Sequence, residues 1–587
     1  MHFVKKVPTT EEEEAVRRKE KAIKQKLFCT IRDKIFEKAE KNEFDDGMLD
    51  LTQKLLEKNP DIHTLWIYRR NTIESYLNSR DALRNKEDSA DSLELAEQKV
   101  ENVLNNELHV TQNCFEVNPK SYTTWCHRGW VLKQLANPNI KKELGLCEKA
   151  LKMDCRNFHV WDHRRVVTKI GNIPKEEEID FSNKLIGDNF SNYSAWHYRV
   201  TLLPRVKDEE AFFNGSYRMD DKTLEEELKK VTSAFYTDPD DQSAWVYTRW
   251  LLDISSDKEW MILDSRSPSV PVSITFNGDR TTIVMSKATN EDVVQSFLKS
   301  ETEGELIAYS GLSNSPKTAK IWHFTGTTPV KLVTNGLDVP NYDCKDGNYI
   351  NKKFFYLAFG IEPHNTNSAV LKLTENCKEL IDLEPQNVWA LAMYTYCLIA
   401  TSPKKEHSRI LSNLKKLSEE LDVKRKEMYM ALASRELLNE RLRSVDGNGK
   451  MAIDNILNDV NSNFSFRNGQ VTSLNGIEYL AGFIKELDIS GNSLRDVLDI
   501  VLPNLTSLDL GSNKIEKLEN CEALHGLKFL SLAACPIVNA QSVTDELRKM
   551  SSLERFLFAE TNLNGKDQMS QVVACLSTEC RLIPHWM

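Results

Sequence analysis

The chain has 587 residues, of which 40% are hydrophobic and 28% charged, and its net charge is −10. This length predicts several domains, and the composition excludes a disordered chain. The acidic balance argues against nucleic acid as a partner and favours basic protein surfaces. No apolar run of about 18 residues occurs, so no transmembrane helix is expected.

The cysteines and the N-terminus indicate the compartment. Twelve cysteines are scattered without a C-x-x-C pair. This pattern is typical of free thiols in a reducing environment, and the N-terminus lacks the apolar core of a signal peptide. We therefore expect a cytoplasmic protein. The sequence contains no H-E-x-x-H, P-loop or G-x-S-x-G motif, so no self-contained catalytic motif is recognised.

The first predicted element is a long charged helix within residues 9–42. Leu27, Phe28, Ile31 and Ile35 lie on one of its faces, which we expect to rest on the next pair of helices. Its mixed charges are typical of a solvated helix surface, so this segment predicts no partner of its own.

After this helix, a sequence motif recurs in which an Arg follows a Trp by about one helical turn. Turn residues such as Asn, Asp and Ser precede each Trp, and an amphipathic segment precedes each turn, which predicts two helices joined by a turn. The three middle Trp residues are 36 and 35 residues apart, as in helical-hairpin solenoids. The five phrases contain Trp66/Arg69, Trp125/Arg128, Trp161/Arg164, Trp196/Arg199 and Trp245/Arg249, the last with Thr248 at the expected Arg position.

The signature side chains are interpreted as packing residues. Each Trp would stack between helices, and its Arg would pair with an acidic helix end. His127, His163 and His197 each follow a Trp by two residues, and this regularity favours packing over metal binding. A degenerate sixth unit has Trp389 with Met393 at the Arg position.

From about residue 253 to residue 359 the helical period gives way to alternation with a period of two. The stretches VPVSITF and TTIVMS flank NGDR, which predicts a hairpin, and ELIAYS, AKIWHF and PVKLVT follow. We expect a small antiparallel sandwich similar to immunoglobulin folds. A β insertion of no special class is the alternative.

Leucine-rich repeats follow from about Phe483. Four segments at spacings near 22 residues share one frame of Leu and Ile, with Asn492, Asn513, Cys535 and Thr561 at the position that bonds neighbouring backbone. The predicted architecture is mainly α and multidomain: helical repeats in 1–253, the β sandwich in 254–359, helical repeats again in 360–450, and leucine-rich repeats in 451–587.

The turn–Trp–Arg phrase resembles the repeat of protein prenyltransferase α subunits, over roughly residues 45–255 and 365–400. The insert and the C-terminal repeats resemble those of Rab geranylgeranyltransferase α subunits in particular. The resemblance implies an α–α superhelix wrapped around a separate β subunit that carries zinc and most of the lipid pocket, while this chain binds no metal or cofactor alone. The implied reaction transfers geranylgeranyl from geranylgeranyl diphosphate to C-terminal cysteines of Rab GTPases, which a Rab escort protein presents.

Two alternative functions are open. Helical, β-sandwich and leucine-rich modules all bind proteins, so the chain could be a scaffold without transferase activity. It could also be the α subunit shared by farnesyltransferase and type I geranylgeranyltransferase, although that reading leaves the insert and the C-terminal repeats unexplained.

The resemblance also implies site residues. A Lys-x-Tyr pair in one turn of such α subunits lies near the diphosphate, which makes Lys120 and Tyr122 the catalytic candidates. From the residues alone, a solvated lysine and a helix-capping tyrosine are the favoured alternative. Phe158, His159 and Tyr193 hold related turn positions and are candidates for the mouth of the same site. His2 is a candidate ligand of the partner's zinc, and a frayed terminus is the alternative.

Overall fold

A computed structural model describes most of the chain. The described residues are 11–84, 90–210, 217–255, 269–278, 280–299, 304–310, 317–325, 330–332, 342–345, 347–363, 365–559, 561, 570–572, 574, 576 and 580–583. The predicted zinc ligand His2 lies outside them. The chain divides into two compact units, Met1–Leu185 with Asn192–Ala195, and Ile186–Ser191 with Trp196–Met587. Among the described helices, none is both long and apolar enough to cross a membrane.

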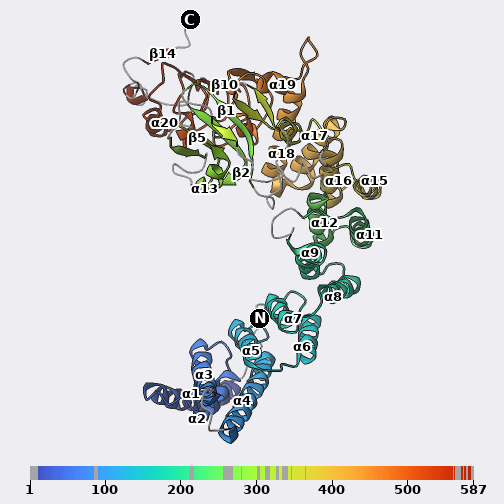
Figure 1. The fold of residues 1–587 in the computed structure, drawn as a ribbon, viewed down its shortest axis with the longest axis vertical. Coiled ribbons are helices and arrows are strands. Elements are labelled where there is room, and N and C mark those ends of the chain that lie inside the picture. Colours follow the sequence, from blue (N-terminus) through green and yellow to red (C-terminus); the bar gives the residue numbers. More distant parts are fainter. Residues whose placement is uncertain are drawn as a thin grey trace. The chain divides into compact units, whose positions relative to one another are not determined.

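The first unit consists of helices that pack in pairs (Figure 1). α2 packs on α3, α4 on α5 and α6 on α7, while α1 packs on α2. The helices are α1 (Glu11–Glu40), α2 (Asp46–Leu56), α3 (His63–Arg84), α4 (Ala90–Val117), α5 (Tyr122–Gln134), α6 (Ile140–Met153), α7 (Phe158–Ile170) and α8 (Lys175–Asp188), the last of which crosses into the second unit. Trp125 and Trp161 therefore lie in second helices, as the repeat predicts.

Each signature Trp fixes the turn that precedes its helix. In all five repeats the indole Nε1 donates a hydrogen bond to the backbone carbonyl six residues upstream. The pairs are Trp66 to Pro60 (2.8 Å), Trp125 to Pro119 (2.9 Å), Trp161 to Cys155 (2.9 Å), Trp196 to Phe190 (2.8 Å) and Trp245 to Pro239 (3.0 Å). The ring thus fills the space between helices while its polar atom satisfies a turn carbonyl.

The face predicted for α1 is only partly covered. Ile35 is fully buried and Ile31 is half-buried, as expected. Leu27 and Phe28, however, are 61% and 37% exposed, so the prediction that they rest on the first helix pair is wrong. The reason is that α1 is 30 residues long and α2 only 11, so burial among the described side chains of α1 is confined to the part of the helix after residue 28.

The second unit continues the helix pairs and adds two sheets. α11 packs on α12, α15 on α16 and α17 on α18, and α15–α16 stacks directly on α11–α12. The longer helices are α9 (Tyr193–Lys207), α11 (Asp221–Thr237), α12 (Gln242–Ile254), α14 (Lys352–Ala358), α15 (Ser368–Leu383), α16 (Val388–Thr401), α17 (His407–Lys416), α18 (Lys426–Arg443), α19 (Ala452–Leu457) and α20 (Ala540–Leu547).

The sixth repeat has a different register from the one predicted. The N-cap residue precedes the Trp by four positions in the earlier repeats, as Asp241 precedes Trp245. In α16 the N-cap is Asn387, so Leu391 occupies the Trp position. Trp389 lies at the helix start instead, beneath the guanidinium of Arg425. Met393 consequently holds the position of the repeat histidines rather than that of the arginines.

The five strand-like stretches of the insert all form strands. The antiparallel sheet has the order β4-β5-β2-β1-β8-β7, and β3 pairs with β6. The strands are β1 (Pro271–Phe276), β2 (Thr281–Thr289), β3 (Leu298–Lys299), β4 (Leu306–Tyr309), β5 (Ala319–Phe324), β6 (Lys331–Leu332), β7 (Asp343–Lys345) and β8 (Asn348–Ile350). The predicted hairpin joins β1 to β2, with Gly278 at φ 72°, a conformation that glycine adopts without strain.

Both faces of the larger sheet are covered. Ile283 and Trp322 lie in a core with α13 (Glu291–Ser296) and residues of β3 and β6. On the other face, Val284 and Ile321 belong to a larger core that includes α14, α18 and the C-terminal region. The sheet approaches that region so closely at Thr275 that residue 482 has no room for a side chain. A Cβ at Gly482 would lie only 2.3 Å from Oγ1 of Thr275.

The C-terminal region is a parallel sheet whose strands follow chain order. They are β9 (Ser462–Ser465), β10 (Ile484–Asp488), β11 (Ser507–Asp509), β12 (Phe529–Ser531), β13 (Arg555–Leu557) and β14 (Arg581–Ile583). Asn513 Nδ2 donates to the carbonyls of Ile489 (3.0 Å) and Leu510 (2.8 Å), and Asn492 makes equivalent bonds. Cys535 Sγ donates to the carbonyl of Leu510 at 3.2 Å. Asn492, Asn513 and Cys535, three of the four side chains predicted to bond neighbouring backbone, therefore do so, and β9 is a strand before the first predicted repeat.

Candidate functional site

Four buried glutamates connect neighbouring helical repeats. Each lies on a first helix, 18 residues before a signature Trp, and each receives two nitrogens of the Arg from the preceding repeat. The pairs are Arg69–Glu107, Arg128–Glu143, Arg164–Glu178 and Arg199–Glu227, with every side chain at most 4% exposed. Bidentate pairing of this kind satisfies both charges in the interior.

A second side chain reaches three of these carboxylates from the repeat's own second helix. His127 Nε2 lies 2.8 Å from Glu107 Oε2, and His163 Nε2 lies 3.2 Å from Glu143 Oε2. Tyr247 donates its hydroxyl to Glu227 at 2.7 Å. Because Arg70 Nε donates to His127 Nδ1, we assign the proton of His127 to Nε2, which then donates to the carboxylate.

These contacts set the charge states of the network. The pKa of each of Glu107 and Glu143 is lowered to about 2, since the neighbouring Arg and His contacts outweigh the opposing effect of burial. Burial lowers the pKa of His127 and His163, which are therefore neutral at pH 7. His197, at the same repeat position, is exposed, so the packing interpretation fails for that residue.

The signature residues are consequently structural, and sequence reasoning missed half of the network. The sequence pointed to acidic helix ends as partners of the arginines, and Glu143 and Glu178 do lie in the first turns of α6 and α8. Glu107, in contrast, lies deep within α4. The constant spacing of 18 residues between Glu and Trp was a signal that could have identified all four glutamates.

The two catalytic candidates lie at the surface of the turn before α5. Lys120 is 65% exposed and its Nζ pairs with Asp154 Oδ2 at 2.8 Å, a contact that lowers the pKa of that carboxyl. Tyr122 is 62% exposed, and its contact with the Cys126 thiol raises the pKa of its hydroxyl. An exposed ion pair contributes at most about 1 kcal/mol, so Lys120 can leave Asp154 for a stronger anion at little cost.

The mouth candidates hold equivalent positions in the next two repeats. Phe158 is 63% exposed and Tyr193 45% exposed, each at the first position of its second helix, as Tyr122 is. The ring of His159 lies 3.9 Å from that of Phe158 and 5.7 Å from that of Tyr122. Burial, with help from Lys120, lowers the pKa of His159, so this ring is neutral at pH 7.

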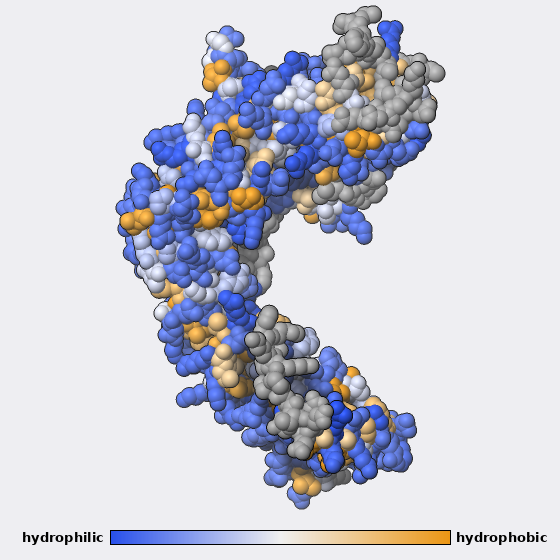
Figure 2. Space-filling view, turned by 180° about the vertical axis from the view of Figure 1, so that it is seen from behind, coloured by the Kyte–Doolittle hydropathy of each residue, from blue (hydrophilic) through white to orange (hydrophobic). Residues whose placement is uncertain are grey.

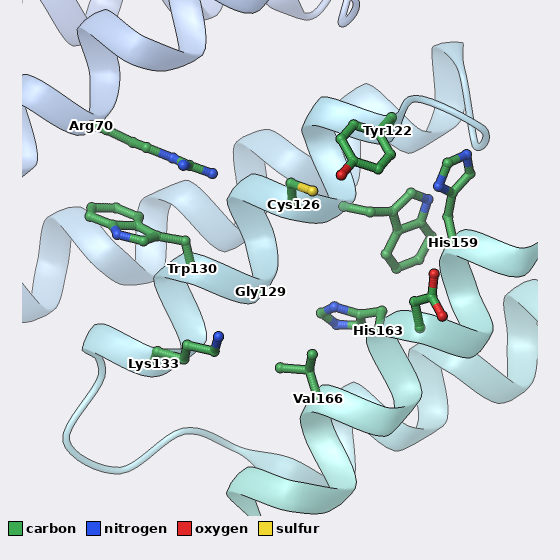
Figure 3. Close-up of a pocket in the computed structure, with 11 residues that line it drawn as sticks. Arg70, Tyr122, Cys126, Gly129, Trp130, Lys133, His159, His163 and Val166 are labelled. Atoms are coloured by element: carbon green, nitrogen blue, oxygen red, sulfur yellow. The ribbon is translucent and has the colours of Figure 1, made fainter. Parts of the chain in front are cut away.

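A pocket of about 430 Å³ adjoins these residues (Figure 3). Tyr122 and His159 line it, whereas Lys120, Phe158 and Tyr193 do not. Its other lining residues are Arg70, Trp125, Cys126, Gly129, Trp130, Lys133, Asp162, His163 and Val166. In Figure 3 the Tyr122 hydroxyl points towards the Cys126 sulfur, and Arg70 approaches from α3. The pocket therefore combines aromatic walls with two cationic side chains.

The positive side chains of this region suit binding of an anion. Within the described part of the chain, no cluster of three or more His, Cys, Asp or Glu side chains could hold a metal ion. Lys120, Lys133 and Arg70 supply positive charge, and Tyr122 supplies a hydroxyl. These groups can bind and orient a charged oxygen ligand, but they include no paired nucleophile and base.

Comparisons with known proteins place these features in context. The family described as protein prenyltransferase alpha subunit repeat matches residues 45–76, 104–135, 140–169, 175–206 and 224–255. The geranylgeranyl transferase type-2 subunit alpha of Homo sapiens is 30% identical over 604 residues, which cover 100% of this chain and 99% of that protein. The Candida albicans protein of the same name is 30% identical over 283 residues, 43% of this chain and 72% of that one.

Among solved structures, a Candida albicans protein geranylgeranyltransferase-I complexed with GGPP aligns at 14% identity and a TM-score of 0.40, covering 74% of this chain and 95% of that one. This similarity is too low to support an argument. The family matches end at residue 255, before the sixth repeat, whose register and signature residues differ.

Proposed function

Because this chain belongs to the α subunits of type-2 geranylgeranyl transferases, we propose that it acts as one half of a heterodimer with a prenyltransferase β subunit. The heterodimer transfers geranylgeranyl from geranylgeranyl diphosphate to C-terminal cysteines of Rab GTPases, which a Rab escort protein presents. The partner subunit contributes the zinc ion, which supplies a thiolate at neutral pH, and most of the lipid pocket.

The observation that carries this proposal is the extent of the match. The human relative aligns over 100% of the chain, including the insert and the C-terminal parallel sheet as well as the repeats. A farnesyltransferase-type α subunit, which is essentially repeat alone, would leave the insert and the C-terminal parallel sheet unmatched. A generic scaffold would need neither the Trp turn nor the Lys-x-Tyr pair in one of those turns.

In the transfer reaction a cysteine sulfur forms a bond to the first carbon of the lipid while the carbon–oxygen bond to the diphosphate breaks. Negative charge therefore grows on the departing diphosphate oxygens, and positive groups placed there stabilise the transition state. We assign this role to Lys120, whose Nζ exchanges Asp154 for a diphosphate oxygen. Tyr122 positions the same oxygens through its hydroxyl, and Phe158, His159 and Tyr193 border the opening.

We further propose the division of the chain into helical repeats at 1–253 and 360–450, an immunoglobulin-like sandwich at 254–359 and a leucine-rich repeat domain at 451–587. The Asn ladder and parallel register support the last assignment, and the two-layered packing of the strands supports the second. The cytoplasm is the proposed compartment, since every described cysteine is free.

The test is geranylgeranyl transfer to a Rab GTPase by the chain co-purified with a prenyltransferase β subunit, with escort protein and lipid diphosphate supplied. Lys120→Ala should lower kcat/KM by about tenfold to a hundredfold, because it removes one of several positive groups at the leaving oxygens. Tyr122→Phe keeps the ring and should cause a smaller loss. Both residues are exposed, so the fold should not change.

Lys141→Ala is the matched control, since this exposed lysine lies in the first turn of α6, at the opposite end of that helix from Asp154. It should leave kcat/KM unchanged. Full activity of the Lys120→Ala heterodimer would remove Lys120 from the mechanism. A chain that remains monodisperse alone and ignores the β subunit would instead favour the scaffold function.

A further inference from the structure

An open groove between α1 and α2 is a second recognition feature of the first unit. It has a volume of about 830 Å³ and lies against the residues whose packing the sequence predicted wrongly. The lining residues are Lys24, Leu27, Phe28, Thr30, Ile31, Lys34, Leu51, Lys54, Leu55, Glu57 and Lys58. On the face drawn in Figure 2, most of the coloured surface is hydrophilic and the hydrophobic residues form small patches.

The floor of the groove is apolar and continuous with the core. Leu55 is 4% exposed and belongs to the buried cluster of the first helix pair, while Ile31 and Leu51 are half-buried against it. Leu27 and Phe28 extend this apolar surface along α1 into the open. Covering such a surface is favourable in proportion to the apolar area removed from water.

The rim of the groove is basic, although the whole chain is acidic. Lys24 and Lys34 project from α1, and Lys54 and Lys58 from the end of α2 and the following turn. Within the described residues none of these four lysines makes an ion pair with a carboxylate. The one acidic lining residue, Glu57, already accepts hydrogen bonds from Gln53 and Asn113. With four lysines and one glutamate, the groove therefore carries a net positive charge.

We propose that this groove is a docking site for an acidic amphipathic helix of a partner protein. A trough between two helices accepts a third helix, whose apolar side chains at positions i, i+3, i+4 and i+7 would cover Leu27, Phe28 and Leu51. Acidic residues along both sides of that stripe would face the four lysines. Complementary charge of this kind sets orientation and rejects basic partners.

A membrane surface fits this geometry less well. Interfacial helices insert apolar side chains that project from the protein, with basic residues beside them. Here Leu51, Leu55 and Ile31 form the floor of a recess between two helices, where a bilayer could not reach them without removing α2. The observations therefore favour a helical peptide over a lipid headgroup layer.

The test uses a labelled synthetic 18-residue peptide with leucines at i, i+3, i+4 and i+7 and glutamates beside them. Its binding is measured by fluorescence anisotropy, with the full chain alone and co-purified with a prenyltransferase β subunit. The Glu peptide should bind both forms, and the same peptide with Lys in place of Glu should bind at least about tenfold more weakly, because like charges repel across the rim.

Two variants localise the binding. Leu27→Asp and the double change Lys54→Glu with Lys58→Glu should each raise Kd about tenfold, the first through lost apolar contact and the second through reversed charge. All three side chains are exposed, so folding should be retained, and circular dichroism checks this. Leu95→Asp is the matched control, since Leu95 is 70% exposed on α4 and outside the groove.

Four results would overturn the proposal. The first is that the Glu peptide binds wild type, Leu27→Asp and the double variant with equal affinity, or that it binds none of these proteins. The second is binding to phosphatidylserine vesicles that Leu27→Asp abolishes while the peptide does not bind. The third is self-association of the chain that Leu27→Asp abolishes. The fourth is loss of peptide binding in the presence of the β subunit, which would assign the groove to the heterodimer interface.

Discussion

Between α4–α5 and α6–α7, neighbouring repeats meet through buried Arg128, Glu143 and His163. Between α11–α12 and α15–α16, the equivalent positions hold Thr248, Leu373 and Met393, which are also buried. Both junctions stack one helix pair on the next. The difference shows that the repeat architecture requires buried volume at these positions rather than charge. Paired charges make a junction specific for its partner residues and make its stability dependent on pH. A neutral junction has neither property.

The largest expected effect comes from breaking the charged junction on one side only. Glu143→Ala leaves the guanidinium of Arg128 buried without its carboxylate, which should cost about 3–5 kcal/mol of local stability. Native-state hydrogen exchange of amides in α5 and α7 measures this loss.

The double change Arg128→Met with Glu143→Leu is the companion variant. It converts the junction to the neutral type and should restore most of the lost stability, because no charge stays buried alone. If the double variant were as unstable as Glu143→Ala, the two kinds of junction would not be interchangeable.

The next largest difference between the charged and the neutral junction should appear in their stability at acid pH. The pKa of Glu143 is about 2 in the fold and 4.5 in its ordinary state, so its ionised form stabilises the fold fully above about pH 4.5. This stabilisation is lost as the pH falls from 4.5 towards 2. The pKa of His163 is lowered from 6.5, so protonation of the unfolded state adds to the loss below about pH 6.5.

Hydrogen exchange across this pH range, corrected for intrinsic exchange rates, measures the effect. Protection of α5 and α7 should fall between pH 4.5 and 2, while protection of α16 should change less. α12 is not the reference, because its Tyr247 contacts the buried Glu227, whose pKa is also lowered to about 2. Parallel loss in α16 would show that acid unfolds the chain globally rather than through the buried carboxylates.

A smaller, stabilising effect is expected at Cys147. Arg69 and Arg128 each donate through Nη1 to a Thr hydroxyl 17 residues upstream, Thr52 and Thr111. The residue 17 positions before Arg164 is Cys147, and among the described groups Arg164 Nη1 has no hydrogen-bond partner. Cys147→Thr should therefore stabilise the α6–α7 pair by about 1 kcal/mol. A destabilised variant would mean that the cavity does not accept the hydroxyl.

The smallest effect is expected at the neutral junction. Thr248 donates its hydroxyl to the carbonyl of Ala244 within its own helix. Val has nearly the same shape, and Thr248→Val removes only that local bond. The loss of stability in α12 should be at most about 1 kcal/mol by hydrogen exchange. A loss as large as that of Glu143→Ala would show that the junction depends on polar contacts after all.

The sequence was sufficient for features that depend on local periodicity. The turn residues before Trp125 and Trp161, the hairpin at Gly278 and the Asn ladder at Asn492 and Asn513 all follow from spacing and residue type. The register of the sixth repeat was mispredicted because a tryptophan by chance lies two residues before the true position, Leu391. Asn387, the helix cap, was the better marker, since capping geometry fixes where a helix begins.

Features that depend on contacts between distant segments could not be predicted in this way. The exposure of Leu27 depends on where α2 ends, and the pairing of Lys120 with Asp154 depends on how two turns approach each other. Neither the exposure of Leu27 nor the pairing of Lys120 with Asp154 is encoded in a local sequence pattern. For the candidate site, the sequence supplied the residues, and the structure added the pocket beside Tyr122 and His159.

The neutral junction also bears on how the chain could acquire an extra domain. The β insert enters between α12 and α15, and those helices belong to repeats that meet at Thr248 and Leu373. A bidentate ion pair needs its donor and acceptor atoms aligned within hydrogen-bonding distance, whereas an apolar contact tolerates small displacements of its side chains. The neutral junction can therefore keep its packing when the connection that carries the insert shifts one helix pair slightly against the other.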